Sequence, residues 1–430
     1  MRSKRTKLGL SIAMALSMLV APVASAESVD TQKVDYLALG DSLAAGQSYN
    51  QTIGKGYTDY ISSQLNKIGV LSSFNKQFSV SGYTTTQILN DIQNNTVKNG
   101  VSIQEAIKNA EIITIDAGAN DLLQLINFDR KELKVTYDQE KLTAGMTAVG
   151  QNLTSIFTKI KELNPKAEIY VMGYYNPFPI LPSQYKEQFL PLLDALNKII
   201  ADTGKPFGAT FVSTADSIAK NAISYLPNIQ DIHPNQAGYL AIANDFWKSI
   251  NVGKKASFND EIPEVAQDEI KYLVEKGIIA GYVNGNFGAN DLITRVQSAI
   301  MLNRAIVYSD DAAPNPNYAD VTESTFGYDV IAKMTQEGVF AGNNQSFNPG
   351  NTLTRAEMAK VLVLAFKLKG TGSKSFNDVG NDYWAASYIS TLAENGITIG
   401  YSNGSFKPND PITRAEFSIM LSRALNDSFK

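Results

Sequence analysis

Short apolar runs alternate with longer amphipathic stretches along the first 250 residues. The runs at 36–39, 77–80, 112–116, 168–173 and 210–213 have the length of buried strands. The stretches at 57–68, 85–94, 102–109, 138–163, 183–202 and 236–248 have helical spacing. Strands that alternate with helices predict a three-layer α/β/α sandwich around a mostly parallel sheet. Right-handed crossovers then bring the carboxyl ends of the strands to one edge of that sheet.

The pattern changes after residue 251, where the chain repeats itself three times. Each unit opens with an aromatic residue two positions before an aspartate, at Asp260, Asp320 and Asp378, and continues into a helical stretch that ends at a glycine. A loop rich in glycine and asparagine follows, and then a second helix introduced by a threonine at 294, 354 or 413. Units of about 60 residues cannot bury a sufficient core alone, so we expect them to pack together as a mainly helical module.

The second helix of each unit begins with Thr-Arg, followed by Gln or Glu two residues later. A threonine at the N-cap and a Gln or Glu three positions on form a capping box, which explains both of those residues. The arginines between them, Arg295, Arg355 and Arg414, need another explanation, because the helix dipole opposes a cation in the first turn. Their repetition indicates either an anionic ligand or an acidic neighbour, such as the aspartate that opens each unit.

The first 26 residues have the composition of a secretory signal peptide. Four basic residues precede a short apolar run, which ends in the Ala-Ser-Ala motif of a cleavage site. No other run is long enough to span a bilayer, so we expect no integral membrane anchor. The remainder is more acidic than the net charge of −4 for the whole chain, which argues against nucleic-acid binding. The chain has no cysteine, which excludes disulfides and thiolate metal sites and suits the exterior of a Gram-positive bacterium.

Polar residues follow several of the predicted strands. Ser42 comes after the first strand, Gly82 after the second and Asn120 after the third, while Asp231 and His233 precede the helix at 236–248. Each has a simple explanation on its own, because serine and asparagine cap helices, glycine forms turns, and a histidine can lie on the surface. Their convergence at one sheet edge, together with the fact that His233 is the only histidine, instead predicts a site of nucleophilic catalysis.

The residue types fit acyl transfer. Serine is a weak nucleophile and needs a base within hydrogen-bonding reach, and histidine suits that role near neutral pH. A carboxylate must orient the imidazole, and Asp231 lies two residues from His233 in the same loop. The backbone N–H groups of Ser42 and Gly82 and the side-chain amide of Asn120 would donate to a developing oxyanion. This chemistry needs no metal ion and no organic cofactor.

With its Gly40-Asp41-Ser42-Leu43, Gly82, Gly118-Ala119-Asn120-Asp121 and Asp231-Ile232-His233-Pro234 motifs, the first half resembles the SGNH, or GDSL, hydrolase family. The resemblance implies an α/β/α fold in which Ser42 is the nucleophile, His233 the base and Asp231 its orienting acid. It also implies an oxyanion hole formed by Ser42, Gly82 and Asn120. The family usually has an asparagine shortly before the glycine of the second motif, whereas Val80-Ser81 precede Gly82 here.

The second half resembles the S-layer homology (SLH) domain, repeated at 256–316, 317–374 and 375–430. The resemblance implies a module that binds pyruvylated secondary cell-wall polysaccharide in grooves between units, where arginine pairs with the ketal carboxylate. Gly288 and Asn348 stand at the position of Lys407 in the first and second units, so we expect the grooves to bind unequally. The residues implied in binding are Asp260, Asp320, Asp378, Arg295, Arg355, Arg414, Trp384 and Lys407.

We therefore expect a signal peptide at 1–26, a hydrolase domain at 27–252 and a wall-binding module at 256–430. The expected protein is a secreted serine esterase or lipase, held on a Gram-positive cell wall and acting on an acyl ester or an acetylated glycan. The alternatives are a carbohydrate O-acetylesterase that acts on wall glycans, and a wall-bound structural or adhesion protein whose first domain is inactive. The segment 174–192, rich in aromatic residues and proline, is either a mobile lid over the substrate or an ordered loop that closes the core.

Overall fold

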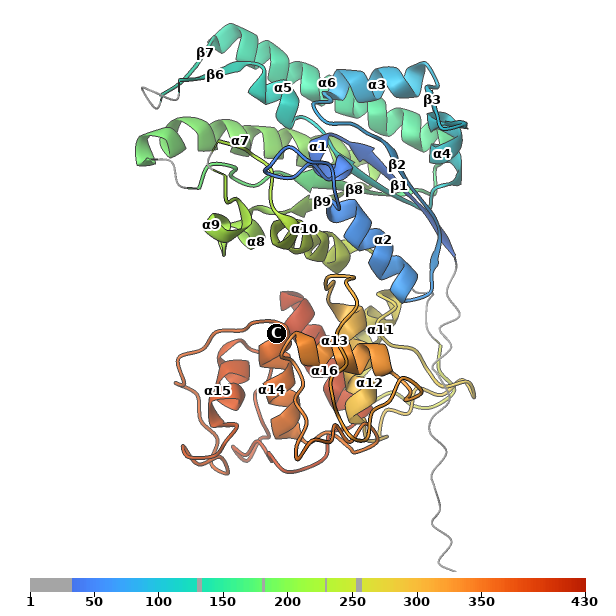
Figure 1. Cartoon of the computed structure of the whole chain (residues 1–430), viewed down its shortest axis with the longest axis vertical. Coiled ribbons are helices and arrows are strands. Elements are labelled where there is room, and N and C mark those ends of the chain that lie inside the picture. The colour runs from blue at the N-terminus through green and yellow to red at the C-terminus, as the bar shows by residue number, and fades with distance from the viewer. Residues whose placement is uncertain (1–32, 130–133, 180–181, 229, 253–256) are drawn as a thin grey trace, which may run out of the picture.

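The computed structural model describes residues 33–129, 134–179, 182–228, 230–252 and 257–430 (Figure 1). The predicted signal peptide at 1–26 lies outside these residues, as does most of the predicted junction between the two halves, at 253–256. None of the helices in the described ranges is both long and apolar enough to cross a membrane.

A five-stranded parallel sheet forms the centre of the first half, as the strand and helix pattern predicted. Its order is β2 (Leu71–Ser79), β1 (Val34–Gly40), β5 (Ile112–Asp116), β8 (Glu168–Gly173) and β9 (Thr210–Ser213). Each neighbouring pair is parallel. The inner strands are buried on both faces, which explains why their sequences are continuous apolar runs.

Some elements of the sheet differ from the prediction. β2 begins at Leu71, six residues before the predicted start, because this outer strand is largely polar and partly exposed and so lacks an apolar run. Two short antiparallel hairpins were not predicted, and they pair β3 (Val97–Lys98) with β4 (Val101–Ser102) and β6 (Ile126–Asp129) with β7 (Lys134–Tyr137).

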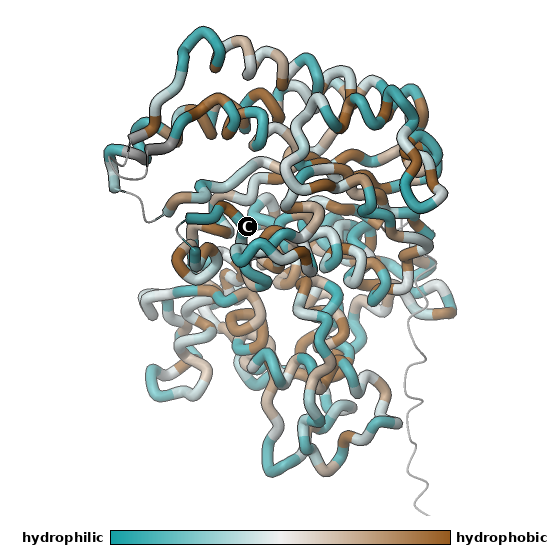
Figure 2. Tube along the Cα trace, turned by 45° about the horizontal axis from the view of Figure 1, so that its top comes forward, coloured by the Kyte–Doolittle hydropathy of each residue, from teal (hydrophilic) through white to brown (hydrophobic). Residues whose placement is uncertain are grey.

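Helices cover both faces of the sheet (Figure 1). One face carries α3 (Thr85–Gln93), α4 (Ile103–Asn109), α6 (Gln139–Leu163) and α7 (Ser183–Gly204), and the other carries α2 (Tyr57–Lys67) and α10 (Gln236–Ser249). Hydrophobic positions gather in the sheet and on the helix faces that meet it (Figure 2). The shorter helices are α1 (Ser42–Ala45), α5 (Ala119–Leu123), α8 (Ala215–Ala219) and α9 (Ala222–Tyr225), with a 3₁₀ turn at Lys205–Phe207.

The second half contains two helices for each repeat. The first helix of one repeat packs against the second helix of another, so that α11 meets α16, α13 meets α12 and α15 meets α14. All three second helices begin with the predicted capping box, at Thr294, Thr354 and Thr413. The helices are α11 (Gln267–Glu275), α12 (Arg295–Ala305), α13 (Tyr328–Gln336), α14 (Arg355–Ala365), α15 (Ala386–Glu394) and α16 (Arg414–Leu425), with 3₁₀ turns at Glu264–Ala266 and Asp427–Phe429.

The three repeats close into a ring through backbone hydrogen bonds. The N–H of Leu353 donates to the carbonyl of Ile293 at 3.0 Å, and the N–H of Ile412 donates to the carbonyl of Leu353 at 2.9 Å. The N–H of Ile293 then donates to the carbonyl of Ile412 at 3.1 Å, which completes the circle. Each of these buried residues directly precedes the capping threonine of its repeat, so the threefold repeat in sequence becomes a threefold arrangement in space.

The repeated arginines join neighbouring repeats. The Nε of each donates to a backbone carbonyl in another repeat, from Arg295 to Phe347 at 2.8 Å, from Arg355 to Phe406 at 2.8 Å and from Arg414 to Phe287 at 3.1 Å. Arg295 and Arg355 also pair with a capping-box glutamate, at 3.3 and 2.9 Å respectively. These acids are Glu357 and Glu416, so the ion pair of each of these two arginines is with a capping-box glutamate. Asp320, which opens the second repeat, is a further acidic neighbour of Arg295.

The two halves meet at the end of α12. The side-chain amide of Gln64, on α2, donates to the carbonyl of Arg304 at 2.9 Å, and the indole of Trp247, on α10, donates to the same carbonyl at 3.0 Å. Asn244 and Val307 exchange two hydrogen bonds of 2.9 Å, and Val307 belongs to the core of the first half. The carbonyls that a helix leaves unpaired at its end are thus used here to join the halves.

We predict that Arg414→Ala destabilises the ring. Arg414 is fully buried and also donates to the carbonyl of Ala280 at 2.8 Å, so its loss leaves buried carbonyls unpaired and opens a cavity. We expect the second half to lose about 3 kcal/mol of unfolding free energy, measured by urea denaturation with amide hydrogen exchange in α12 and α16. The exposed Lys369→Ala variant is the control, and an equal loss in both variants would contradict the prediction.

Candidate active site

Ser42 lies at the tight turn between β1 and α1. The helix is capped by Asp41, whose side chain accepts a hydrogen bond from the N–H of Leu43 at 2.9 Å, so the interpretation of Ser42 as a simple cap is wrong. Gly40 ends β1, and a side chain there would clash with the carboxylate of Asp116 on the neighbouring strand. The turn therefore needs glycine for a close approach between two strands.

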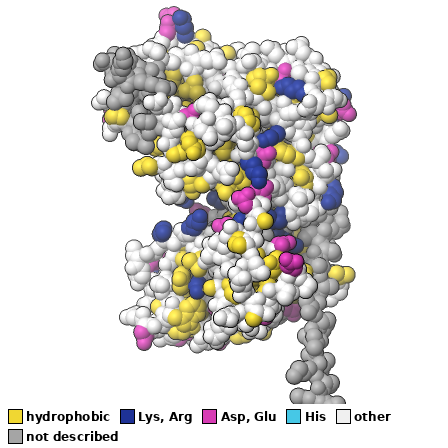
Figure 3. Space-filling view, in the orientation of Figure 1, with side chains coloured by type: hydrophobic (Ala, Val, Ile, Leu, Met, Phe, Trp, Pro, Cys, Tyr) yellow, Lys and Arg dark blue, Asp and Glu magenta, His cyan; other side chains and the backbone are white. Residues whose placement is uncertain are grey.

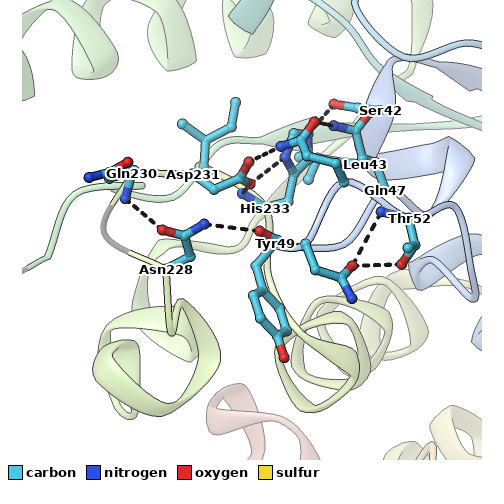
Figure 4. A network of polar contacts seen from close by, with 12 residues as sticks. Ser42, Leu43, Gln47, Tyr49, Thr52, Asn228, Gln230, Asp231 and His233 are labelled. Carbon is cyan, nitrogen blue, oxygen red and sulfur yellow. Dashed lines mark hydrogen bonds and ion pairs between the residues drawn. The ribbon is translucent and has the colours of Figure 1, made fainter.

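Ser42, His233 and Asp231 form a continuous line of hydrogen bonds (Figure 4). His233 Nε2 lies 2.7 Å from Ser42 Oγ, and His233 Nδ1 lies 2.6 Å from Asp231 Oδ1. The same carboxylate oxygen accepts the backbone N–H of His233 at 2.8 Å. All three residues are at most 8% exposed, so these contacts are largely shielded from water. The structure thus brings together three residues that the sequence places up to 191 positions apart.

A glutamine that the sequence did not single out completes this line. The side-chain amide of Gln51 donates to Asp231 Oδ2, the carboxylate oxygen that does not face His233. Gln47 donates to the Oε1 of Gln51 at 2.8 Å, and the amide of Asn228 donates to the carbonyl of Tyr49 at 3.1 Å. The loop after α1 is therefore tied at two points to the loop that carries Asp231 (Figure 4).

Nothing in the local sequence marks Gln51. Its partner lies 180 residues away, and a lone glutamine in a polar loop has no distinctive pattern. The one unusual feature is its left-handed backbone, with φ of 68°, which glutamine rarely adopts and which becomes visible only in the structure.

Two buried carboxyl groups lie beneath the turn. Asp116 accepts hydrogen bonds from the N–H of Ala44 at 3.1 Å and from the hydroxyl of Tyr57 at 2.8 Å, while Asp41 accepts one from the hydroxyl of Tyr174 at 3.0 Å. Burial raises the pKa of Asp116 well above its usual value, and the charge of Asp41 raises it further. The hydrogen bonds from Tyr57 and Ala44 act in the opposite direction and lower the pKa of Asp116.

The three expected oxyanion donors lie at the ends of β1, β2 and β5. Within the described ranges, the N–H groups of Ser42 and Gly82 donate to no other residue. The side-chain amide of Asn120 donates to the carbonyl of Tyr83 at 2.9 Å, which fixes its orientation beside Gly82. Asn120 does not cap α5. The N-cap of this helix is Gly118, so no side chain caps its first turn.

The start of the aromatic segment 174–192 is ordered and buried. Tyr174 reaches Asp41, and the hydroxyl of Tyr175 donates to the carbonyl of Ile232 at 2.8 Å, next to His233. Of the two interpretations of this segment, the loop that closes the core therefore applies to these two tyrosines. From Ser183 onward the segment belongs to α7, which contains Pro191.

The aspartates implied in wall binding are engaged within their own repeats. Both carboxylate oxygens of each accept backbone N–H groups from the loop that precedes the second helix, at 2.6 to 2.8 Å. These hydrogen bonds hold the pKa of Asp320 below its usual value against the opposing effect of burial. The loop bonds account for Asp260, Asp320 and Asp378 without a ligand.

Trp384 and Arg295 line one groove of about 510 Å³ between repeats. Lys360 lines the same groove, and its Nζ lies 5.9 Å from the centre of the Trp384 ring. The comparison of the repeats did not identify Lys360, because the other two repeats have isoleucine at this position. Lys407 lies elsewhere, over the ring of Tyr401 at 4.7 Å. Arg355 and Arg414 are almost entirely buried between repeats.

Comparison with known proteins agrees with the sequence motifs. Residues 38–241 match the model of the GDSL-like lipase/acylhydrolase family, and residues 257–297, 317–359 and 375–418 match the S-layer homology domain. The chain is 36% identical over 186 residues to a surface-layer 125 kDa protein of Lysinibacillus sphaericus, a match that covers 41% of this chain and 16% of that protein. It is 31% identical over 153 residues to an S-layer protein of Bacillus thuringiensis subsp. finitimus, over 35% of this chain and 19% of that protein. The chain thus spans less than a fifth of the length of these curated relatives.

Two solved structures are similar to the first half. A lipase from a goat rumen metagenome is 22% identical, with a TM-score of 0.40, and the match covers 50% of this chain and 96% of that chain. An acetylxylan esterase from Geobacillus stearothermophilus is 17% identical, with a TM-score of 0.37, over 51% of this chain and 94% of that chain. The family matches and the motifs together show a GDSL-like lipase/acylhydrolase domain at 38–241, followed by three SLH domains in the second half.

Proposed function

We propose that this protein is a secreted serine ester hydrolase held on the bacterial cell wall by its SLH domains. The observation that carries the proposal is the line of contacts from Asp231 through His233 to Ser42, at 2.6 and 2.7 Å. An ionised carboxylate can only accept hydrogen bonds, so Nδ1 of His233 carries the proton and Nε2 is free to accept one from the serine hydroxyl.

In the proposed reaction, Ser42 Oγ attacks the ester carbonyl while its proton moves to Nε2 of His233. The imidazolium gives that proton to the leaving alcohol, and the acyl group remains on Ser42. Water, deprotonated by the same histidine, then attacks the acyl group and releases the acid.

Two sets of groups would stabilise the charges that develop. The N–H groups of Ser42 and Gly82 and the amide of Asn120 would donate to the oxyanion. Asp231 would balance the charge of the imidazolium, and Asp41 would contribute. Burial raises the pKa of Asp41, whereas its hydrogen bonds and a positive charge on His233 lower that pKa.

The three SLH domains support attachment to the cell surface through wall polysaccharide. We propose that the groove lined by Arg295, Lys360 and Trp384 takes part, because it combines two cations with a half-exposed aromatic ring. A pyruvylated polysaccharide would offer carboxylates to such cations. Asp260, Asp320, Asp378, Arg355, Arg414 and Lys407 remain implied by the family resemblance alone.

The line of hydrogen bonds also weighs against an inactive first domain. A structural protein has no need for a buried, unprotonated imidazole nitrogen directed at a serine. Release of acetate or of fatty acid from suitable esters would distinguish an O-acetylesterase from a lipase.

We predict that Ser42→Ala abolishes hydrolysis of p-nitrophenyl acetate. Removal of the nucleophile from such a site lowers kcat by at least about 10³-fold. Unfolding in urea and sedimentation with purified walls should match the unmodified protein. Equal rates for the two proteins would exclude the proposed mechanism.

We also predict that Gln51→Glu moves the acidic limb of the kcat/KM profile to higher pH. The new carboxylate would lie beside Asp231, and two anions would favour the imidazolium over the neutral imidazole. Gln151→Glu, on the exposed face of α6, adds the same charge and serves as the control. A profile that moves equally in both variants would show that Gln51 does not position Asp231.

For wall attachment, we expect the full chain to sediment with purified Gram-positive walls. Binding should be lost from walls stripped of secondary polysaccharide, and also from walls that lack only its pyruvate, because the polysaccharide then offers no carboxylate to the cations of the groove. Undiminished binding to stripped walls would indicate another ligand.

A further inference from the structure

A second hollow, of about 670 Å³, lies beyond the carboxyl ends of β8 and β9. It is lined by the segment after β8, the start of α7, and α8 with α9. These elements come from the same edge of the sheet as Ser42, since β1, β5, β8 and β9 are parallel neighbours. The motifs of the first half do not include any residue that lines it.

The hollow is built against the loop that carries His233. On one side, the side-chain amide of Asn235 donates to the carbonyl of Ser224, a residue that lines the hollow, at 2.7 Å. On the other side, Tyr175 bonds to the carbonyl of Ile232, and the next residue, Asn176, lines the hollow. Both walls are thus attached to residues within two positions of the histidine, so the hollow lies beside the loop that carries it.

The chemistry of the hollow combines an apolar floor with positive charge. Its floor is formed by small or aliphatic side chains of α8 and α9, among them Ile223, which is 72% exposed. Lys186 and Lys220 also line it, and within the described ranges neither ammonium group forms a hydrogen bond or an ion pair. The described residues that line the hollow include no aspartate or glutamate, so its charges have a single sign.

Lys220 also has acidic neighbours outside the hollow. The charge of Lys220 contributes to lowering the pKa of Asp427, which is lowered mainly by Lys430, and it also acts against the effect of burial, which raises the pKa of Asp245. In the space-filling view, Lys and Arg side chains lie among Asp and Glu side chains along the border between the two halves (Figure 3).

We propose that this hollow binds an anionic glycan portion of the ester substrate, so that the enzyme acts on acylated acidic polysaccharide. This inference rests on the proposed hydrolase function and names its substrate class. The C–H faces of sugars suit the apolar floor, and carboxylate or phosphate groups suit the two lysines. A simple fatty acyl chain would use the floor but has no charge remote from the ester, and would leave both lysines without a partner.

The experiment compares two O-acetylated probes of equal length, an oligogalacturonate that carries carboxylates and a neutral xylo-oligosaccharide. Acetate release is measured for the unmodified full chain and for its Lys186→Gln, Lys220→Gln and double variants. The matched control is Lys198→Gln, which removes a lysine from α7 that pairs with Asp202 and does not line the hollow. The quantity measured is the ratio of kcat/KM for the acidic probe to that for the neutral probe.

We expect the unmodified protein to prefer the acidic probe. Each single variant should lower the ratio about three-fold and the double variant about ten-fold, as exposed charge pairs allow. Salt should weaken the preference of the unmodified protein, because it screens the lysines. A ratio that is the same in the unmodified and double-variant proteins overturns the proposal while the hydrolase function stands.

A second measurement does not depend on turnover. Trigalacturonate, a probe without an ester, should protect Lys186 and Lys220 from chemical acetylation, with Lys198 as the unprotected reference. Absence of protection overturns the subsite even if no ester is hydrolysed. If trigalacturonate protects both lysines but no Ser42-dependent hydrolysis is detected, the subsite stands and the proposed hydrolase function is excluded.

Discussion

The contact between Ser42 Oγ and His233 Nε2 is the constraint on which the first half depends. It joins residues 191 positions apart, and an error of about 1 Å in either position would break the hydrogen bond. β1 and its glycine turn fix the serine, while Gln51, Tyr175 and Asn235 fix the loop that carries the histidine. The parallel sheet makes this possible, since it delivers all of these segments to one edge.

The layer beneath the contact is polar, which is unusual for the centre of a sheet. Asp41 and Asp116 are buried there with hydrogen bonds from Tyr57, Tyr174 and the first turn of α1. Burying two carboxyl groups without such donors would cost several kcal/mol, whereas hydrogen-bond donors from three elements offset that cost. The same hydrogen bonds fix the direction of α1, and so the position of the serine at its start.

The sequence predicted features that are encoded locally. Continuous apolar runs identified the inner strands, and Thr294, Thr354 and Thr413 identified the starts of three helices, because cap and box residues are neighbours in sequence. β2 was predicted too short, because an outer strand that is partly exposed carries no apolar run. Gln51, Lys360 and the partners of the repeated arginines could not be found, since each depends on a contact across the fold.

One helix connects the two proposed activities of the chain. The first residue of α12, Arg295, lines the groove with Trp384, and near its other end the carbonyl of Arg304 is bonded by Gln64 and Trp247 of the first half. An eleven-residue helix spans about 16 Å and is stiff over that length. A polysaccharide held at its start would therefore also fix the orientation of the hydrolase domain attached at its end. Under the proposed function, attachment and substrate position would be linked in this geometry, because the wall polymer and the ester would be presented to one continuous body.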